Sequence, residues 1–176
     1  GGFRACITAD PGELLISADF AGVELRGAAA LSGDTELKAI LAEGRDIHAE
    51  IARIVWGPGF TKEHRYQAKP MVFQRLYGGG PSGISRQNGV SLDLAKSVVN
   101  AMDAMMPGLA EWSRMIAGGI EAGRTKFPTY AGRVIHMPTD RPYAGGNYAI
   151  QGTCRELLGD ALLRWSQTPW GQATLL

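Results

Sequence analysis

The sequence has few cysteines, no long apolar run and no excess of charge of one sign. Its 176 residues include only Cys6 and Cys154, which are too few and too far apart for a disulfide framework or a zinc site. We therefore expect two reduced thiols in a cytoplasmic protein. No run of about 18 apolar residues occurs, and the N-terminus lacks the basic-then-apolar layout of a signal peptide. These absences predict no association with a membrane.

The composition is that of one globular domain with a substantial core. Hydrophobic residues make up 45% of the chain, and 18 lysines and arginines face 17 acids, for a net charge of +1. The charges are unevenly distributed, since residues 1–60 hold 5 bases and 9 acids, whereas residues 61–90 hold 5 bases and 1 acid. If both segments face one cleft, the bases suit a polyanionic substrate and the acids a cation, although solvated faces also produce such differences.

The spacing of apolar residues and turn signals predicts an α+β fold with more helix than strand. A turn at Pro11-Gly12 precedes a short apolar run at 14–20 that has the length of a buried strand and delivers Asp19 to its end. A second strand is expected at 133–137, and Gly78 to Gly83 is expected to be a turn or mobile loop. Helices are expected at 22–31, 34–43, 46–56, 61–77, 91–105, 107–122 and, capped by Thr153, 153–165.

Two acids stand at the junction between the first predicted strand and helix. An acid at the exit of a buried strand is well placed to bind a divalent cation, but a strand-terminal aspartate such as Asp19 is more often a turn or capping residue. Glu24 follows five residues later. It is equally compatible with a second ligand, a surface acid and the wall of a pocket.

A stripe of four side chains follows the helix predicted at 61–77. Arg65, Lys69, Phe73 and Tyr77 recur at intervals of four, so they wind slowly along one face over about 18 Å, with two cations followed by two rings. A nucleoside triphosphate has the same polarity, because its phosphates bind cations and its base stacks on aromatic rings. The alternative is a helix whose rings belong to the core and whose bases are solvated.

Two amides lie near the start of the last predicted helix. Asn147 and Gln151 could bind the minor-groove acceptors that all base pairs share, although capping is the commoner role of such residues. The three histidines, His48, His64 and His136, lack a partner at the spacing of a metal set. We interpret them as structural or surface residues.

Four segments, in this order, resemble the polymerase core of family A DNA polymerases, the DNA polymerase I type of bacteria and many phages. The segment from Asp19 to Arg26, with the trailing L-S-G-D, is similar to D-Y-S-Q-x-E-L-R of the first palm motif. The segment from Asp46 to His48 resembles the family's D-I-H. Residues 65–78 resemble the fingers helix R-x-x-x-K-x-x-x-F-G-x-x-Y-G, and residues 147–153 resemble N-x-P-x-Q-G-T.

The resemblance implies roles at the nucleotide site. Asp19, with the carbonyl of Phe20, would bind two catalytic Mg²⁺ ions. Glu24 would be the steric gate that excludes a 2′-hydroxyl, and its carboxylate could pair with a fingers side chain when the site closes. Arg65 and Lys69 would hold the phosphates of the incoming nucleotide. Phe73 and Tyr77 would stack on the new base pair.

The resemblance also implies partners and a domain division. The partners would be primer–template DNA and deoxynucleoside triphosphates. Arg26 would support the nucleic-acid backbone or the Glu24 gate, and Gln151, with Asn147 nearby, would probe the minor groove. Palm pieces at 1–30 and 131–176 would flank fingers at 31–130, which include the nucleotide-binding helix 61–78.

Several residues depart from the family pattern. Pro70 stands inside the fingers helix, where it removes a hydrogen bond and should kink the helix. Gln74 and Gly22 replace a glycine and a glutamine of the motifs. The V-H-D-E segment with the second catalytic aspartate is absent, so we expect a palm-and-fingers fragment that does not polymerise alone and needs a further C-terminal palm segment.

The predicted function is therefore that of a fragment of a template-directed DNA polymerase, which transfers deoxynucleotides to a primer 3′-hydroxyl by a two-metal mechanism. One alternative is a non-catalytic nucleic-acid-binding remnant, which the single catalytic carboxylate favours for the isolated chain. Another is a single-subunit phage-type RNA polymerase, against which Glu24 argues. The third and least favoured alternative is a metal-dependent hydrolase in which Asp19 binds the metal.

Overall fold

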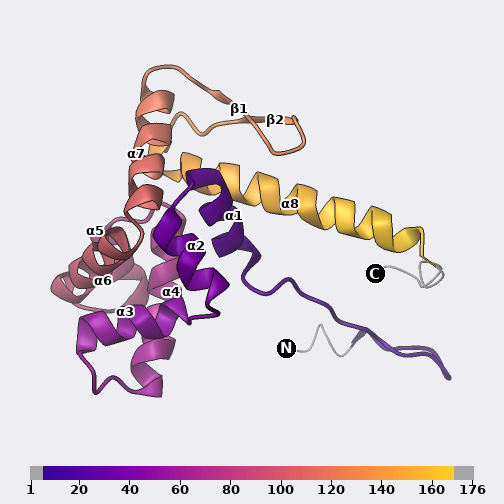
Figure 1. Ribbon diagram of the computed structural model, residues 1–176, viewed down its shortest axis with the longest axis horizontal. Coiled ribbons are helices and arrows are strands. Elements are labelled where there is room, and N and C mark those ends of the chain that lie inside the picture. The colour runs from indigo at the N-terminus through magenta and orange to yellow at the C-terminus, as the bar shows by residue number, and fades with distance from the viewer. Residues whose placement is uncertain (1–5, 169–176) are drawn as a thin grey trace.

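The computed structural model describes residues 6–168, which form a set of packed helices with one small β-hairpin (Figure 1). The chain thus has the helix-rich α+β organisation that the sequence predicts. The helices are α1 (Val23–Ser32), α2 (Thr35–Ala42), α3 (Ile47–Trp56), α4 (Lys62–Leu76), α5 (Pro81–Asn88), α6 (Leu92–Met105), α7 (Pro107–Glu121) and α8 (Gly145–Ser166). The strands are β1 (Lys126–Pro128) and β2 (Val134–His136), followed by the 3₁₀ helix η2 (Pro142–Ala144).

Capping residues set several helix starts as the sequence predicts. Asp46 accepts hydrogen bonds from the backbone N–H groups of the first turn of α3, Ser91 caps α6, and Pro107 occupies the first turn of α7. Asp34 caps α2 through Leu37 N at 2.7 Å, and its other carboxylate oxygen accepts from Leu109 N at 2.8 Å. This one buried side chain therefore also fixes α7 against the start of α2.

The strand predicted at 14–20 is wrong. These residues have no regular secondary structure, and Leu14 and Ile16 are 88% and 87% exposed. Figure 1 shows the segment running away from the helices. A strand needs a neighbour for its N–H and C=O groups, and among the described residues no chain pairs with this one. The turn at Pro11-Gly12 is present, with Glu13 N donating to Asp10 O.

Three other elements differ from prediction. Pro81 starts α5, so the predicted loop ends in a helix instead of continuing to Gly83. The last helix begins at Gly145, eight residues before Thr153, and has no side-chain cap. The predicted second strand is present as β2, and β1 pairs with it antiparallel, with Phe127 opposite Ile135.

The core lies where the helices cross. α3 packs on α4 and α6, α5 on α6, and α8 on both α1 and α7. The largest fully buried side chains come from six of the eight helices and one connection: Leu37, Ile51, Met71, Val72, Ile84, Val98, Met106 and Ile150. No helix of residues 6–168 is long and apolar enough to cross a membrane.

Candidate functional site

The predicted stripe lies on α4 and its C-cap. A capping box between Thr61 and His64 starts the helix, which runs unbroken through Pro70 to Leu76. Lys69 and Tyr77 are exposed, Arg65 and Phe73 are half-buried, and the rings of Phe73 and Tyr77 lie 6.2 Å apart. The helix thus presents two cations and then two rings, as the spacing predicts.

The first turn of α3 contacts this stripe. Arg65 Nε donates to Asp46 Oδ2 at 2.6 Å, and the same aspartate caps α3. Burial raises the pKa of Asp46, but the hydrogen bonds from Arg65 and from the backbone of Ala49 outweigh it, so the pKa is lowered. The Asp46 carboxylate therefore stays ionised and holds the guanidinium against the helix start.

His48 is a buried residue that lies beside the stripe. Its ring lies 5.4 Å from that of Phe73, and its Nδ1 is buried with no hydrogen-bond partner in the described part of the chain. Burial lowers its pKa, Asp46 opposes this, and the charges of Arg65 and Lys69 lower it further. A neutral imidazole thus stands beside the cations. The D-I-H pattern is the clue that could have identified it.

Glu24 joins three parts of the chain. Its Oε2 accepts from the hydroxyl of Tyr77 at 2.8 Å, and its Oε1 accepts from Nε2 of Gln151. The first turn of α1, the end of α4 and the second turn of α8 therefore meet at one carboxylate. Burial, then the hydrogen bond and charge of Glu24, raises the pKa of Tyr77 to about 12.

Backbone geometry explains two glycines of the site. Gly22 has φ 63° at the N-cap of α1, a conformation that glycine adopts without cost and glutamine does not. Gly78 follows α4 with φ 86°, and a Cβ there would clash with the backbone oxygen of Tyr143. The end of α4 is thus fixed against η2.

Side-chain contacts hold α4 against its neighbours. Both Arg75 Nε and Nη2 donate to Asp103 of α6, at 2.7 to 3.1 Å. Gln74, at the position of a family glycine, accepts from Nδ2 of Asn88 on α5 at 2.8 Å. These contacts orient the helix, so that its stripe faces α3 and Glu24.

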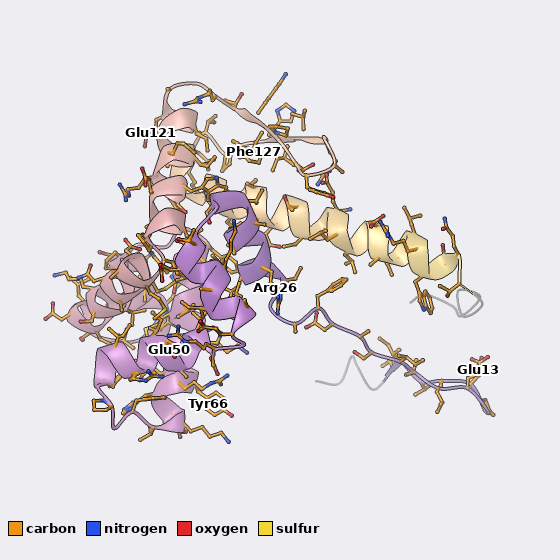
Figure 2. The ribbon with its side chains drawn as sticks, in the orientation of Figure 1. Glu13, Arg26, Glu50, Tyr66, Glu121 and Phe127 are labelled. Atoms are coloured by element: carbon orange, nitrogen blue, oxygen red, sulfur yellow. The ribbon has the colours of Figure 1, made fainter. Side chains whose placement is uncertain are left out.

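Arg26 and Asn147 do not join the Glu24 cluster through a hydrogen bond. Arg26 Nε donates to the carbonyl of Ala21 at 3.2 Å, which braces the connection between the N-terminal segment and α1 (Figure 2). Asn147 lies in the first turn of α8, and its Oδ1 is buried with no partner in the described chain. It is four residues, about one helical turn, before Gln151.

Asp19 and Phe20 lie in the irregular segment before α1, and both are exposed. A carboxylate and a carbonyl oxygen are ligands that Mg²⁺ prefers. However, residues 6–168 contain no group of three or more His, Cys, Asp or Glu side chains that could hold a metal ion. One carboxylate does not complete a site for two ions, so the described residues alone do not fit the predicted metal centre.

Comparisons with known proteins identify relatives over nearly the whole chain. The family model of DNA polymerase family A matches residues 2–169. The chain is 38% identical over 164 residues to the DNA polymerase of Mycobacterium phage D29, covering 92% of this chain and 27% of the relative. It is 30% identical over 176 residues to the thermostable DNA polymerase I of Thermus filiformis, covering 92% and 21%.

A solved structure shares the fold. The polymerase domain of Pol1 from M. smegmatis, in complex with DNA primer-template and dNTP, superposes with a TM-score of 0.71 at 22% sequence identity, covering 85% of this chain and 29% of that one. The chain thus spans about a quarter of the length of these relatives.

Proposed function

Because the chain belongs to DNA polymerase family A, we propose that it is part of an enzyme that adds deoxynucleotides to a primer 3′-hydroxyl under the direction of a template. The observation that carries this proposal is the meeting of Tyr77 and Gln151 at Glu24, next to the cationic stripe of α4. This contact joins α4, the proposed nucleotide-binding helix, to α8, which carries the amides Asn147 and Gln151 that are proposed to contact the minor groove. We assign the reaction to the cytoplasm, where bacterial and phage DNA is copied.

The stripe of α4 binds the incoming nucleotide in this proposal. Lys69 is exposed and forms no ion pair with the residues that the structure describes, so its charge is available to the triphosphate, while Arg65 is oriented by Asp46. Positioned cations stabilise the charge that develops on a departing pyrophosphate. Phe73 and Tyr77 stack on the new base pair, and the neutral ring of His48 adds a hydrogen-bonding group beside them.

Glu24 selects the sugar in this proposal. Its carboxylate is held on both sides by Tyr77 and Gln151, so it keeps a fixed position. A fixed side chain beneath the sugar discriminates sterically against a 2′-hydroxyl, because the clash destabilises only the ribonucleotide. Gln151 and Asn147 contact the minor groove of the primer–template duplex, and Arg26 supports the Glu24 side of the site.

The domain division follows the same scheme. Palm pieces at 1–30 and 131–176 flank fingers at 31–130, which is supported by the packing of α1 on α8. In a complete polymerase, Asp19 and the carbonyl of Phe20 would supply part of the ligands that hold Mg²⁺. The remaining carboxylate comes from a palm segment outside this chain, and the exposed leucines of residues 13–20 and of α8 are suited to pack against it.

A second candidate function is non-catalytic binding of nucleic acid. It is favoured because residues 6–168 contain no group of three or more His, Cys, Asp or Glu side chains that could hold a metal ion. The two candidates share every DNA contact and differ only in catalysis. Primer extension therefore distinguishes them.

The proposal predicts catalysis only in a completed polymerase. We expect the 176-residue chain to extend no primer in Mg²⁺. A chimaera in which it replaces the matching segment of the phage D29 polymerase should extend the primer, and Asp19→Ala should abolish that extension. The Asp10→Ala chimaera, which removes an acid from the same N-terminal segment, is the control and should remain active.

Two results of this assay would contradict the proposal. Extension that survives Asp19→Ala would remove the metal role of Asp19. A well-folded chimaera that binds primer–template DNA without extending it would favour the non-catalytic candidate.

A further inference from the structure

The turn that joins β1 to β2 is attached to α8 by one carboxylate. Glu156 accepts hydrogen bonds from the hydroxyl of Thr129, from the backbone N–H of Ala131 at 2.9 Å and from Nε of Arg133 at 3.0 Å. Its side chain is only 12% exposed. The hydrogen bonds from Thr129 and Ala131, followed by that from Arg133, lower its pKa, so the carboxylate is ionised at neutral pH.

The attachment lies next to the amide at the candidate site. Arg133 also donates through Nη2 to the carbonyl of Gly152, the residue after Gln151. A Cβ on Gly152 would lie 3.2 Å from Cδ1 of Ile135 and 3.3 Å from Cγ2 of Thr129. The hairpin thus packs on the backbone of α8, and its turn has a fixed position relative to Gln151. Figure 1 shows the hairpin beside the first half of α8.

The segment that contains the hairpin carries more bases than acids. Residues 122–156 contain five lysines and arginines and two acids, Asp140 and Glu156, which pair with Arg141 and Arg133. Lys126 and Arg155 are exposed, and Tyr130 at the tip of the turn is 79% exposed. A rigid turn with exposed cations and an aromatic ring is suited to the sugar–phosphate backbone of a nucleic acid.

We propose that Glu156 is a positioning residue that holds the turn 129–133 on α8, so that the turn contacts the backbone of the same duplex whose minor groove Gln151 reads. The inference rests on the proposed function and extends it to the hairpin. Glu156 carries a negative charge toward a polyanion, which by itself opposes binding. If Glu156 acts by positioning the turn, this effect exceeds the repulsion, so loss of the Glu156 charge should weaken DNA binding.

The test compares two substitutions that remove the same charge from the same helix. Asp160 lies one turn after Glu156 and pairs with Arg164, and both side chains of that pair are exposed. Removal of a charge alone predicts that Glu156→Gln and Asp160→Asn both strengthen DNA binding. Positioning predicts that Asp160→Asn binds equally well or better, whereas Glu156→Gln weakens binding about threefold to tenfold through loss of preorganisation.

The 176-residue chain and its two variants are titrated against a fluorescein-labelled primer–template duplex, with fluorescence anisotropy as the readout. NMR hydrogen exchange at the amide of Ala131 reports the attachment itself. We expect protection in the wild type and in Asp160→Asn, and rapid exchange in Glu156→Gln. Helical circular dichroism should be the same in all three.

Each outcome separates this inference from the function on which it rests. Glu156→Gln binding as tightly as the wild type, or protection of Ala131 that survives the substitution, overturns the positioning role and leaves the polymerase proposal standing. No binding of the duplex by any of the three proteins overturns both the nucleic-acid contact of the hairpin and the DNA-binding part of the proposed function.

Discussion

At the scale of single residues, the site depends on contacts between residues far apart in sequence. The hydroxyl of Tyr77, at the end of α4, donates to Glu24, which lies 53 residues earlier in the sequence. The bond from Gln151 was not predicted, because the sequence does not show how α8 crosses α1. The position of His48 beside the stripe was not predicted for a similar reason. Spacing in the sequence identifies neighbours on the same helix. Phe73 and Lys69, which lie near His48, come from a different helix, α4.

The Glu24–Tyr77 contact predicts an alkaline titration. Tyr77 has a pKa of about 12 in the fold against 10.0 in the unfolded chain. Since the folded value is the higher, its contribution to stability is complete below pH 10 and is lost as the pH rises toward 12. We expect Glu24→Gln to lower the pKa of Tyr77 while leaving it above 10.0, because burial is the largest cause.

Ultraviolet absorbance of tyrosinate measures this shift, with Tyr77→Phe identifying the transition among the five tyrosines. Tyr130→Phe, at the exposed tip of the hairpin, is the control. If Tyr77 titrates at the same pH in the wild type and in Glu24→Gln, the Glu24 carboxylate does not raise the pKa of the Tyr77 hydroxyl.

At the scale of elements, local patterns predicted most helices and failed where pairing decides the structure. The first turns of α3, α6 and α7 carry their own capping or proline signals, so their starts were predicted to within about a residue. The strand at 14–20 was wrongly predicted and β1 was missed, because a strand depends on a partner strand that apolar spacing does not identify. Likewise α8 begins in a glycine-rich segment because Gly145 and Gly146 pack closely on α7.

The proline inside α4 predicts a gain in stability on its removal. Pro70 has no N–H for the carbonyl of Tyr66 one turn earlier, and both residues are exposed. Pro70→Ala should restore that hydrogen bond and raise the free energy of unfolding by about 1–3 kcal/mol. Urea denaturation measures this change.

Pro107→Ala is the matched control, because Pro107 occupies the first turn of α7, where a proline costs nothing. We expect it to leave stability unchanged or slightly lower. Equal effects of the two substitutions would mean that α4 accommodates Pro70 without strain.

At the scale of the whole molecule, two apolar surfaces have no partner in the described structure. One is the N-terminal segment with Leu14 and Ile16, and the other is the second half of α8. The exposed leucines of α8 are Leu157, Leu158, Leu162 and Leu163. Burying a leucine or isoleucine stabilises a structure by about 1.5–3 kcal/mol, so these surfaces favour packing against other polymerase segments. Since the chain spans about a quarter of the length of its relatives, a complete polymerase of this family contains such segments.

This argument predicts that residues 13–20 become a strand in the completed enzyme. In the isolated chain their backbone groups face water and should exchange hydrogen rapidly. In the chimaera with the phage D29 polymerase, pairing with a further palm strand should slow that exchange by orders of magnitude. Hydrogen–deuterium exchange with mass spectrometry measures both, and the buried centre of α6 around Val98 serves as the control, since it should be equally protected in the two proteins. Rapid exchange of residues 13–20 in an active chimaera would show that Asp19 reaches its metal ions from an irregular segment and that no palm strand forms there.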